Sequence, residues 1–143
     1  MTDRCAIESQ TELNSEMRIV IADQEPSTRS ALGMLVRAQS DMELVGEAAD
    51  LVDLLSQIKG NSPDLVILDC DVLGQRIDIL LDLLSLFDSP PTIVGLSVHA
   101  VSRQAAMQVG VDAFACKAEH PERLLAAIRA TRKQTNPTHD HRE

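Results

Sequence analysis

The sequence predicts an α/β fold in which a five-stranded parallel sheet has helices on both faces. Five short apolar segments alternate with helical segments between residues 17 and 132. This alternation is typical of parallel sheets, because each parallel strand needs a crossover helix before the next strand begins. The chain has 143 residues, 44% of them hydrophobic, which suffices for one domain with its own core. We expect a flexible leader at 1–16, the domain at 17–132, and a polar tail or the start of a linker at 133–143.

The strands are predicted from short apolar segments. We expect them at residues 18–22, 43–47, 64–69, 92–97 and 112–116. The first segment, RIVIA, is nearly continuous in its apolar character, as a strand buried on both faces requires. The third, DLVILD, is the most apolar of the five, whereas ELVGE is weaker and suits an edge of the sheet.

The helices are predicted from apolar residues at helical spacing and from residues that begin or end helices. We expect helices at 26–40, 50–59, 76–87 and 100–109, and a last one from about residue 120 through 128, after which the chain turns polar near Thr131. Pro26 suits a first helical turn, Asp50 is a candidate N-cap, and Gly110 suits the position just after a helix. The Leu-rich helix at 76–87 has more apolar residues than one buried face needs, so it is either deeply packed or part of a dimer contact, and we favour packing.

Composition excludes several classes of function. Thirteen Lys and Arg against 22 Asp and Glu give a net charge of −9, which disfavours direct binding to nucleic acid or to an anionic membrane. The chain has no Trp or Tyr and only two Phe, so it lacks surfaces on which bases stack. No apolar segment reaches the roughly 18 residues of a membrane span, and the first residues are not a signal peptide. Three widely spaced Cys without a C-x-x-C motif argue against a disulfide framework, so we expect a cytoplasmic protein.

Acidic and polar residues follow several of the predicted strands. If the strand order is 2-1-3-4-5, Asp23 and Asp69 end neighbouring strands at the point where the order reverses, and ligands of such sheets bind there. Asp71 lies close by, and Ser97 and Lys117 end two further strands at the same edge. Clustered carboxylates repel one another, and Mg²⁺ would offset that repulsion. An Asp beside Mg²⁺ and a Lys can attack a phosphoryl group, so the residues predict phosphoryl acceptance on Asp69. Any one of these residues alone would be an ordinary helix cap or surface group; their convergence favours function.

Residues 17–132 resemble a response regulator receiver domain of two-component systems. The matching motifs, in the family's order and at about its spacing, are RIVIADQEP (18–26), DLVILDCDVLG (64–74), IVGLS (93–97) and DAFACK (112–117). The resemblance implies a flavodoxin-like (βα)5 fold with strand order 2-1-3-4-5. The IAD-x-x-P start and VGEAAD (45–50) are most similar to the subfamily with a C-terminal helix-turn-helix output domain. No such domain follows here, so we expect a single-domain regulator or an excised domain.

The resemblance implies a magnesium-dependent phosphoacceptor site. Asp69 would be the phosphoacceptor, and Mg²⁺ would be held by Asp23, Asp69 and the backbone carbonyl of Asp71. Gln24 stands where the family usually has a second acid after the first strand. Its amide oxygen can coordinate a metal but brings no negative charge, so we expect weak Mg²⁺ binding and slow phosphorylation.

The resemblance also implies a switch and its partners. Ser97 and Lys117 would bind the phosphoryl group, and Phe114 would be the aromatic residue that reorients with Ser97. The donor would be a phosphohistidine on a sensor histidine kinase or a phosphotransfer protein. Signals usually leave through the surface formed by the helix at 100–109, the strand at 112–116 and the last helix, often by homodimerisation. The domain would be a signalling switch and not an enzyme.

Two other functions remain open. The departure at Gln24 is compatible with an atypical receiver that serves as a phosphorylation-independent protein-interaction module. The sequence DCDV at 69–72 also fits the nucleophile motif of a haloacid-dehalogenase-type phosphatase. That motif normally lies on the first strand of the fold, whereas here it follows the third expected strand, which makes this the minor alternative.

Overall fold

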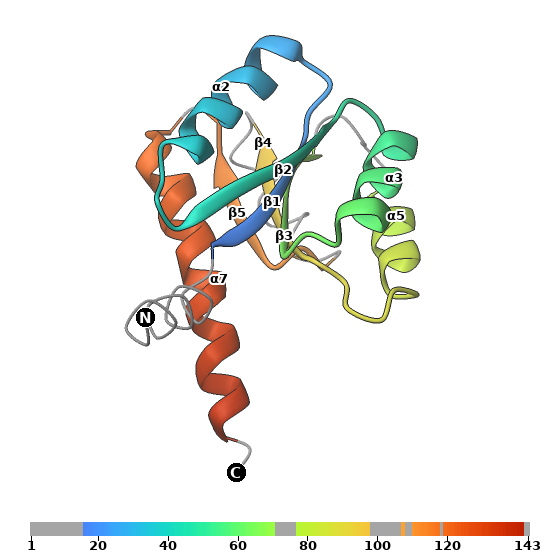
Figure 1. The fold of residues 1–143 in the computed structure, drawn as a ribbon, viewed down its shortest axis with the longest axis vertical. Helices are drawn as coiled ribbons and strands as arrows, with labels where there is room; N and C mark the ends of the chain where they lie inside the picture. The colour runs from blue at the N-terminus through green and yellow to red at the C-terminus, as the bar shows by residue number, and fades with distance from the viewer. Residues whose placement is uncertain (1–15, 71–76, 98–106, 108–109, 118, 142–143) are drawn as a thin grey trace, which may run out of the picture.

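A parallel sheet forms the centre of the molecule (Figure 1). The computed structural model describes residues 16–70, 77–97, 107, 110–117 and 119–141. The strands are β1 (Met17–Ala22), β2 (Met42–Ala48), β3 (Leu65–Asp69), β4 (Thr92–Ser97) and β5 (Ala113–Cys116). They form a five-stranded sheet in the order β2-β1-β3-β4-β5, and every neighbouring pair is parallel. The predicted fold and strand order are therefore confirmed, and the weak ELVGE segment lies in an edge strand.

Helices pack on both faces of the sheet. They are α2 (Pro26–Arg37), α3 (Leu51–Asn61), α5 (Ile77–Leu84) and α7 (Pro121–His141). Figure 1 shows α2 and α7 on one side of the sheet and α3 and α5 on the other. Pro26 is the first residue of α2, and the Asp50 side chain accepts a hydrogen bond of 2.8 Å from the Asp53 amide, which confirms the predicted N-cap. Gly110 has a φ of 115°, a backbone angle that glycine adopts readily. The helix predicted at 100–109 lies almost entirely outside the described residues.

The last helix is longer than the apolar pattern of the sequence. Ile128 is fully buried and Thr131 nearly so, but α7 continues beyond both to His141. Helical hydrogen bonds form within the helix itself and do not require an apolar face. In Figure 1 the end of α7 extends away from the sheet.

The core consists of two apolar layers, one on each face of the sheet. In β1, Ile19 and Ile21 face the layer that includes Ile128 of α7, whereas Val20 faces the layer that includes Leu80 of α5. All five of these side chains are fully buried. The alternation follows from strand geometry, because successive side chains point to opposite faces. Strands β1 and β3 are thereby packed between the two apolar layers, with Val66 and Leu68 of β3 in one layer and Leu65 and Ile67 in the other.

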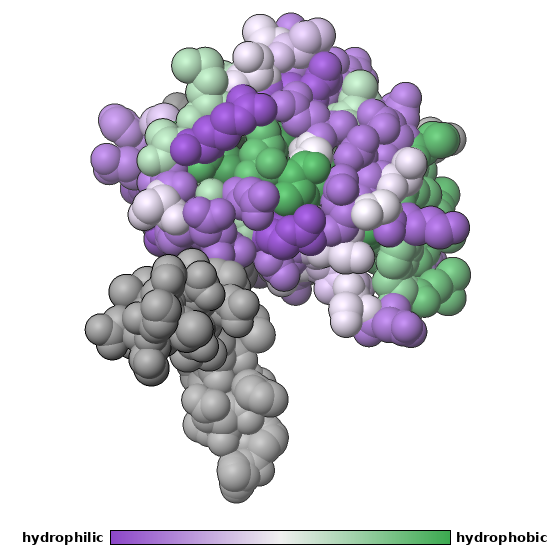
Figure 2. All heavy atoms as spheres, viewed as in Figure 1, coloured by the Kyte–Doolittle hydropathy of each residue, from purple (hydrophilic) through white to green (hydrophobic). Residues whose placement is uncertain are grey.

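In the Leu-rich segment, one face of α5 is buried in the core, and other apolar residues of the segment are exposed. Leu80 and Leu84 lie in the core, whereas Ile79 is 49% exposed and Leu86 is 78% exposed. Figure 2 shows apolar side chains gathered at the surface over this region. The favoured prediction of packing is therefore correct for one face only. Within the described ranges, none of the helices combines the length and apolar character that a bilayer span requires.

Candidate functional site

The residues predicted to form the site lie at one edge of the sheet. Asp23 directly follows β1, Asp69 ends β3, Ser97 ends β4 and Lys117 directly follows β5. Because all the strands are parallel, their carboxyl ends meet at this edge. The register agrees, since Asp69 is the partner of Leu96, and the neighbouring Ser97 is the partner of Cys116. The structure therefore brings together four residues that the sequence predicted to converge.

A lysine joins the two carboxylates. The Lys117 Nζ lies 2.9 Å from Asp23 Oδ2 and 3.0 Å from Asp69 Oδ2. Asp23 is 1% exposed and Asp69 is 5% exposed, so both carboxylates are largely removed from water. Two carboxylates and one ammonium leave one net negative charge in this buried group. A buried charge needs a partner, and Lys117 supplies it for both acids.

The pKa of Lys117 reflects this position. Burial of the ammonium lowers its pKa, but the attraction of the Asp23 and Asp69 carboxylates beside it outweighs burial and raises the pKa above 10.5. Lys117 is therefore charged at neutral pH. It can neutralise negative charge on either acid, or on a group attached to one of them.

Backbone groups hold Asp23 in a fixed orientation. Its Oδ1 accepts a hydrogen bond of 2.9 Å from the Glu25 amide, and its own amide donates to the Ala48 carbonyl at 3.0 Å. The Arg29 guanidinium donates to the Asp23 carbonyl at 2.6 Å. The other carboxylate oxygen of Asp23, Oδ2, is buried. Among the described residues, the Lys117 ammonium approaches this oxygen, but no hydrogen bond of regular geometry reaches it. Asp23 thus offers one carboxylate oxygen to the centre of the site.

Ser97 ends β4, the strand next to β3, and Phe114 lies on β5, the edge strand beside β4. Ser97 is fully buried, and its carbonyl accepts a hydrogen bond of 2.7 Å from the Lys117 amide. Phe114 is half-buried and packs against the core layer that contains Cys70. The roles predicted for Ser97 and Phe114 in binding a phosphoryl group and in switching stay predictions.

Gly95 provides space beside the site, and this role was not predicted from the sequence. A Cβ atom at Gly95 would lie 2.7 Å from Cys70 Sγ and 3.5 Å from Phe114 Cδ1. Cys70 follows Asp69, so a side chain at Gly95 would press on the strand that carries this acid. The sequence did contain an indication of this, because a glycine inside an apolar strand often marks a position where another part of the chain approaches the strand closely.

The metal ligands expected from the sequence are only partly brought together. Gln24 and Glu25 are exposed, and the Glu25 carboxylate accepts a hydrogen bond from Ser27 Oγ at 3.1 Å. Asp71 lies outside the described residues. Among the residues that are described, no three His, Cys, Asp or Glu side chains are arranged to hold a metal ion. Mg²⁺ is often held by one or two carboxylates together with water and phosphate oxygens, so Asp23 and Asp69 fit a weakly held Mg²⁺.

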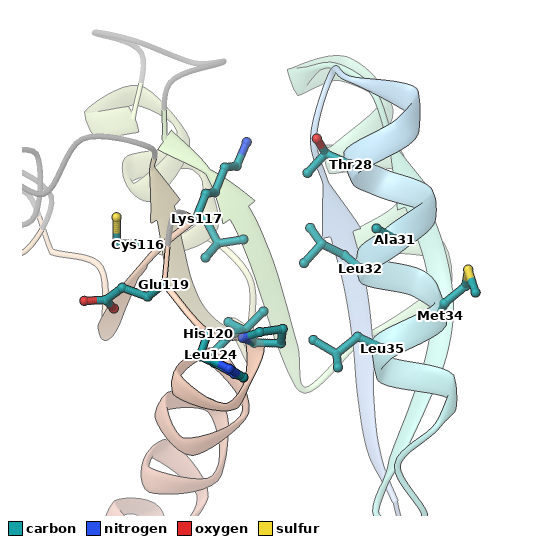
Figure 3. A pocket seen from close by; sticks show the side chains of 12 residues that line it. Thr28, Ala31, Leu32, Met34, Leu35, Cys116, Lys117, Glu119, His120 and Leu124 are labelled. Atoms are coloured by element: carbon teal, nitrogen blue, oxygen red, sulfur yellow. The ribbon is translucent and has the colours of Figure 1, made fainter.

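A groove borders the site between α2 and the start of α7. Its volume is about 640 Å³, and apolar side chains from both helices line most of it, among them Leu32, Leu35 and Leu124. Figure 3 shows Leu32 and Leu35 pointing from α2 toward the strands, with Leu124 on the opposite wall and Lys117 at the end of β5. The groove was not predicted from the sequence.

The comparisons with known proteins identify the family. The model of the response regulator receiver domain matches residues 19–129, which is most of the chain. The chain belongs to the response regulator receiver domain family. The sensory transduction protein LytT of Bacillus anthracis is 25% identical over 118 residues, covering 82% of this chain and 48% of LytT. The uncharacterized transcriptional regulatory protein YhcZ of Bacillus subtilis is 32% identical over 114 residues, covering 76% of this chain and 52% of YhcZ.

Solved structures of receiver domains have the same fold. A LuxR-family two-component response regulator from Aurantimonas sp. SI85-9A1 has a TM-score of 0.73 and 24% identity, covering 82% of this chain and 85% of that one. The receiver domain of the response regulator NarL from Mycobacterium tuberculosis has a TM-score of 0.73 and 23% identity, covering 83% of this chain and 98% of that one. The chain spans about half the length of the curated relatives it matches.

Proposed function

We propose that this receiver domain accepts a phosphoryl group on Asp69 from a phosphohistidine and acts as a phosphorylation-dependent signalling switch. The observation that carries the proposal is the Lys117 ammonium, 3.0 Å from Asp69 Oδ2 at the carboxyl edge of the sheet. A buried carboxylate beside a fixed positive charge is suited to become an acyl phosphate, because that charge offsets the negative charge of the incoming group.

The transfer would proceed by attack of an Asp69 carboxylate oxygen on phosphorus. The bond between phosphorus and the donor imidazole nitrogen breaks, and its electron pair stays on that nitrogen. The products are an acyl phosphate on Asp69 and a free histidine on the donor. Lys117 would neutralise charge on the phosphoryl oxygens, and the Ser97 hydroxyl would hydrogen-bond one of them.

Magnesium would be held by Asp23, Asp69 and the backbone carbonyl of Asp71. When bound, it would supply positive charge beside the phosphoryl oxygens. The amide oxygen of Gln24 would add at most a neutral ligand, and its side chain is exposed at the rim of the site. We therefore propose weak Mg²⁺ binding.

The signal would be a change in the relative populations of two conformations of the domain. Contacts of the phosphoryl group with Ser97 and Lys117 would favour one of them, and Phe114 would reorient with Ser97. Phe114 is only half-buried. The proposed dimer surface includes β5, α7 and the segment 100–109, which lies almost entirely outside the described residues.

The proposed donor is a sensor histidine kinase or a phosphotransfer protein. One solved structure that shares the fold is CheY6 of R. sphaeroides in complex with the P1 domain of CheA3, with a TM-score of 0.69 and 21% identity to this chain. That complex supports the proposed class of partner.

The test is the intact mass of the protein after incubation with Mg²⁺ and a small acyl-phosphate donor. We expect one phosphoryl adduct on the unmodified protein and none on Asp69→Asn. Asp82→Asn is the matched control, because Asp82 is an exposed acid on α5, and we expect it to keep the adduct. An adduct that persists on Asp69→Asn, or no adduct at high Mg²⁺, would contradict the proposal.

The second candidate is a phosphorylation-independent interaction module. Two observations favour it: Gln24 brings no charge to the site, and Lys117 already pairs with both acids. Absence of an adduct, together with no response to beryllofluoride, would support it. The receiver-family match over residues 19–129, and the position of Asp69 at the end of the third strand instead of the first, argue against a haloacid-dehalogenase-type phosphatase. Steady release of phosphate from small phosphate esters would restore that alternative.

A further inference from the structure

We propose that the exposed side of α5 is a docking surface for an amphipathic helix of another protein that carries basic residues beside its apolar stripe. This α5 surface consists of Ile79, Asp82, Leu83 and Leu86, together with a hollow beside the end of the stripe. None of these residues belongs to the candidate site, so the inference does not depend on phosphoryl acceptance.

Apolar residues repeat along the exposed side of α5 at the spacing of a helix–helix contact. Ile79, Leu83 and Leu86 are separated by four and then three residues, which places them in one stripe of a helix. Leu86 follows the end of α5, but its amide donates to the Leu83 carbonyl at 3.1 Å, so the turn continues the stripe. Leu83 is half-buried, and Ile79 and Leu86 are exposed (Figure 2). Leu80 and Leu84 already supply the core contact of α5, so this second stripe is open to a partner.

The charges around the stripe are negative. Residues 77–97 contain Asp78, Asp82 and Asp88 but no Lys or Arg. Asp82 lies three residues after Ile79 and four before Leu86, so it borders the stripe, and its side chain is exposed. Asp88 is exposed too, and within the part of the chain that the structure describes neither Asp82 nor Asp88 forms an ion pair. Basic side chains of a partner would complement these acids.

A hollow of about 470 Å³ lies beside the end of the stripe. Phe87, Asp64 and Asp88 are among the residues that line it, so an aromatic ring and two exposed acids border the same space. The Arg18 guanidinium donates to the Ser62 carbonyl at this hollow at 3.2 Å, which sets one positive charge against two carboxylates. An arginine of the partner suits the hollow, because its stem packs on apolar atoms while its guanidinium contacts carboxylates.

A second copy of this chain is the main alternative occupant, and charge disfavours it. Each copy carries a net charge of −9, and a contact between two α5 surfaces would bring the acids of both copies together. The length of the stripe also disfavours a permanent homodimer. Residues 77–86 span about 15 Å at 1.5 Å per residue, whereas permanent homodimers usually bury large interfaces. A short basic helix, held by an apolar stripe and by charge, fits this surface better.

The test is a titration of ¹⁵N-labelled protein with two synthetic peptides, followed by nuclear magnetic resonance. Both peptides have about 15 residues and the same leucine stripe, and they differ only in carrying Lys and Arg or Glu beside the stripe. We expect the basic peptide to shift the amide signals of α5 and of the turn that follows it. The acidic peptide should bind at least about tenfold more weakly, and added salt should weaken binding of the basic peptide.

Two variants separate the apolar and the charged parts of the surface. Leu86→Ser shortens the apolar stripe, and Asp82→Lys reverses the charge beside it. Both side chains are exposed, so we expect both variants to fold, which circular dichroism checks. Each should weaken binding of the basic peptide at least about fivefold. Met34→Ser is the matched control, because Met34 is 68% exposed on α2 and lines the groove between α2 and α7, and its affinity should be unchanged.

Several results would overturn the proposal. Equal binding of the two peptides, or no binding of the basic one, would remove the charge argument. Shifts confined to the groove between α2 and α7, or loss of binding in Met34→Ser, would place the peptide elsewhere. Self-association of the free protein that Leu86→Ser abolishes in sedimentation equilibrium would identify a second copy as the occupant. The titration uses unphosphorylated protein, so failure of Asp69 to form an adduct would leave these expectations unchanged.

Discussion

Gly95 of β4 should not tolerate a side chain, and Gly95→Ala tests this. The added Cβ would lie 2.7 Å from Cys70 Sγ, which is closer than carbon and sulfur atoms pack. Cys70 is 8% exposed and directly follows the end of β3, so it has little room to move. Overpacking of a core by one methyl group costs about 1–3 kcal/mol. For a domain of this size a cost of about 2 kcal/mol lowers Tm by roughly 4–8 °C.

The assay is thermal and urea unfolding followed by circular dichroism, because the chain has no Trp or Tyr for fluorescence. Gly60→Ala is the matched control: it lies in α3, and nothing approaches within 4 Å of its Cβ position. Alanine has a higher helix propensity, so we expect that variant to be as stable as the unmodified protein or more so.

A double-mutant cycle tests the steric cause itself. Cys70→Ala removes the sulfur atom, so the cost of Gly95→Ala should be smaller in that background by about 0.5–3 kcal/mol. An equal cost in both backgrounds would show that the sulfur atom is not the obstacle. A Gly95→Ala variant as stable as the unmodified protein would refute the reasoning altogether.

Three further predictions concern the stability of the fold. Asp50→Ala removes the side-chain hydrogen bond of 2.8 Å at the start of α3 and should lower the free energy of unfolding in urea by about 1 kcal/mol. Arg129→Met removes the ion pair of 2.9 Å with Asp41 and should cost at most about 1 kcal/mol, because both side chains are partly exposed. The hydrogen bond from Arg129 lowers the pKa of Asp41 below 3.8, so the contribution of the pair is present at neutral pH and is lost as the pH falls through the folded-state pKa. Urea midpoints of the variant and the unmodified protein should therefore converge on acidification. Leu80→Ala should cost about 2–5 kcal/mol because this side chain is fully buried, whereas Ile79→Ala, 49% exposed, should cost much less in the same urea experiment.

Each of these predictions has an outcome that contradicts it. An Asp50→Asn variant should keep the cap, so equal losses for Asn and Ala would argue against the hydrogen bond as the cause. A constant difference between Arg129→Met and the unmodified protein across the acid range would contradict the pKa argument. Equal losses for Leu80→Ala and Ile79→Ala would contradict the burial of one face of α5.

The sequence predicted the elements better than their ends. The helix expected at 26–40 ends at Arg37 in the structure, where the Gln39 amide side chain donates to the Leu35 carbonyl at 3.0 Å. No glycine or proline marks this end, so the sequence pattern offered no signal for it. At the other end of the chain, α7 continues beyond Ile128, where the apolar spacing stops. Both differences arise because helix ends depend on local hydrogen bonds, which leave little trace in apolar periodicity.

The sequence predicted which residues form the candidate site, but not which of them form ion pairs with one another. Asp23, Asp69, Ser97 and Lys117 follow strand ends, and strand ends of a parallel sheet meet at one edge. That Lys117 contacts both acids at about equal distance could not be predicted, because it depends on how the end of β5 is aimed. The roles assigned to these residues remain predictions until the phosphoryl adduct is measured.

The sequence by itself determined the parallel sheet and the edge where the acids lie. Alternating apolar segments fix which residues enter strands, and the parallel arrangement then fixes where each strand ends. The tertiary structure alone decided contacts across the fold: the lysine shared by two carboxylates, the sulfur atom over Gly95, and Arg129 paired with Asp41. These contacts join residues far apart in the chain, and their distances of a few ångströms follow from how helices and strands pack, which no local pattern encodes.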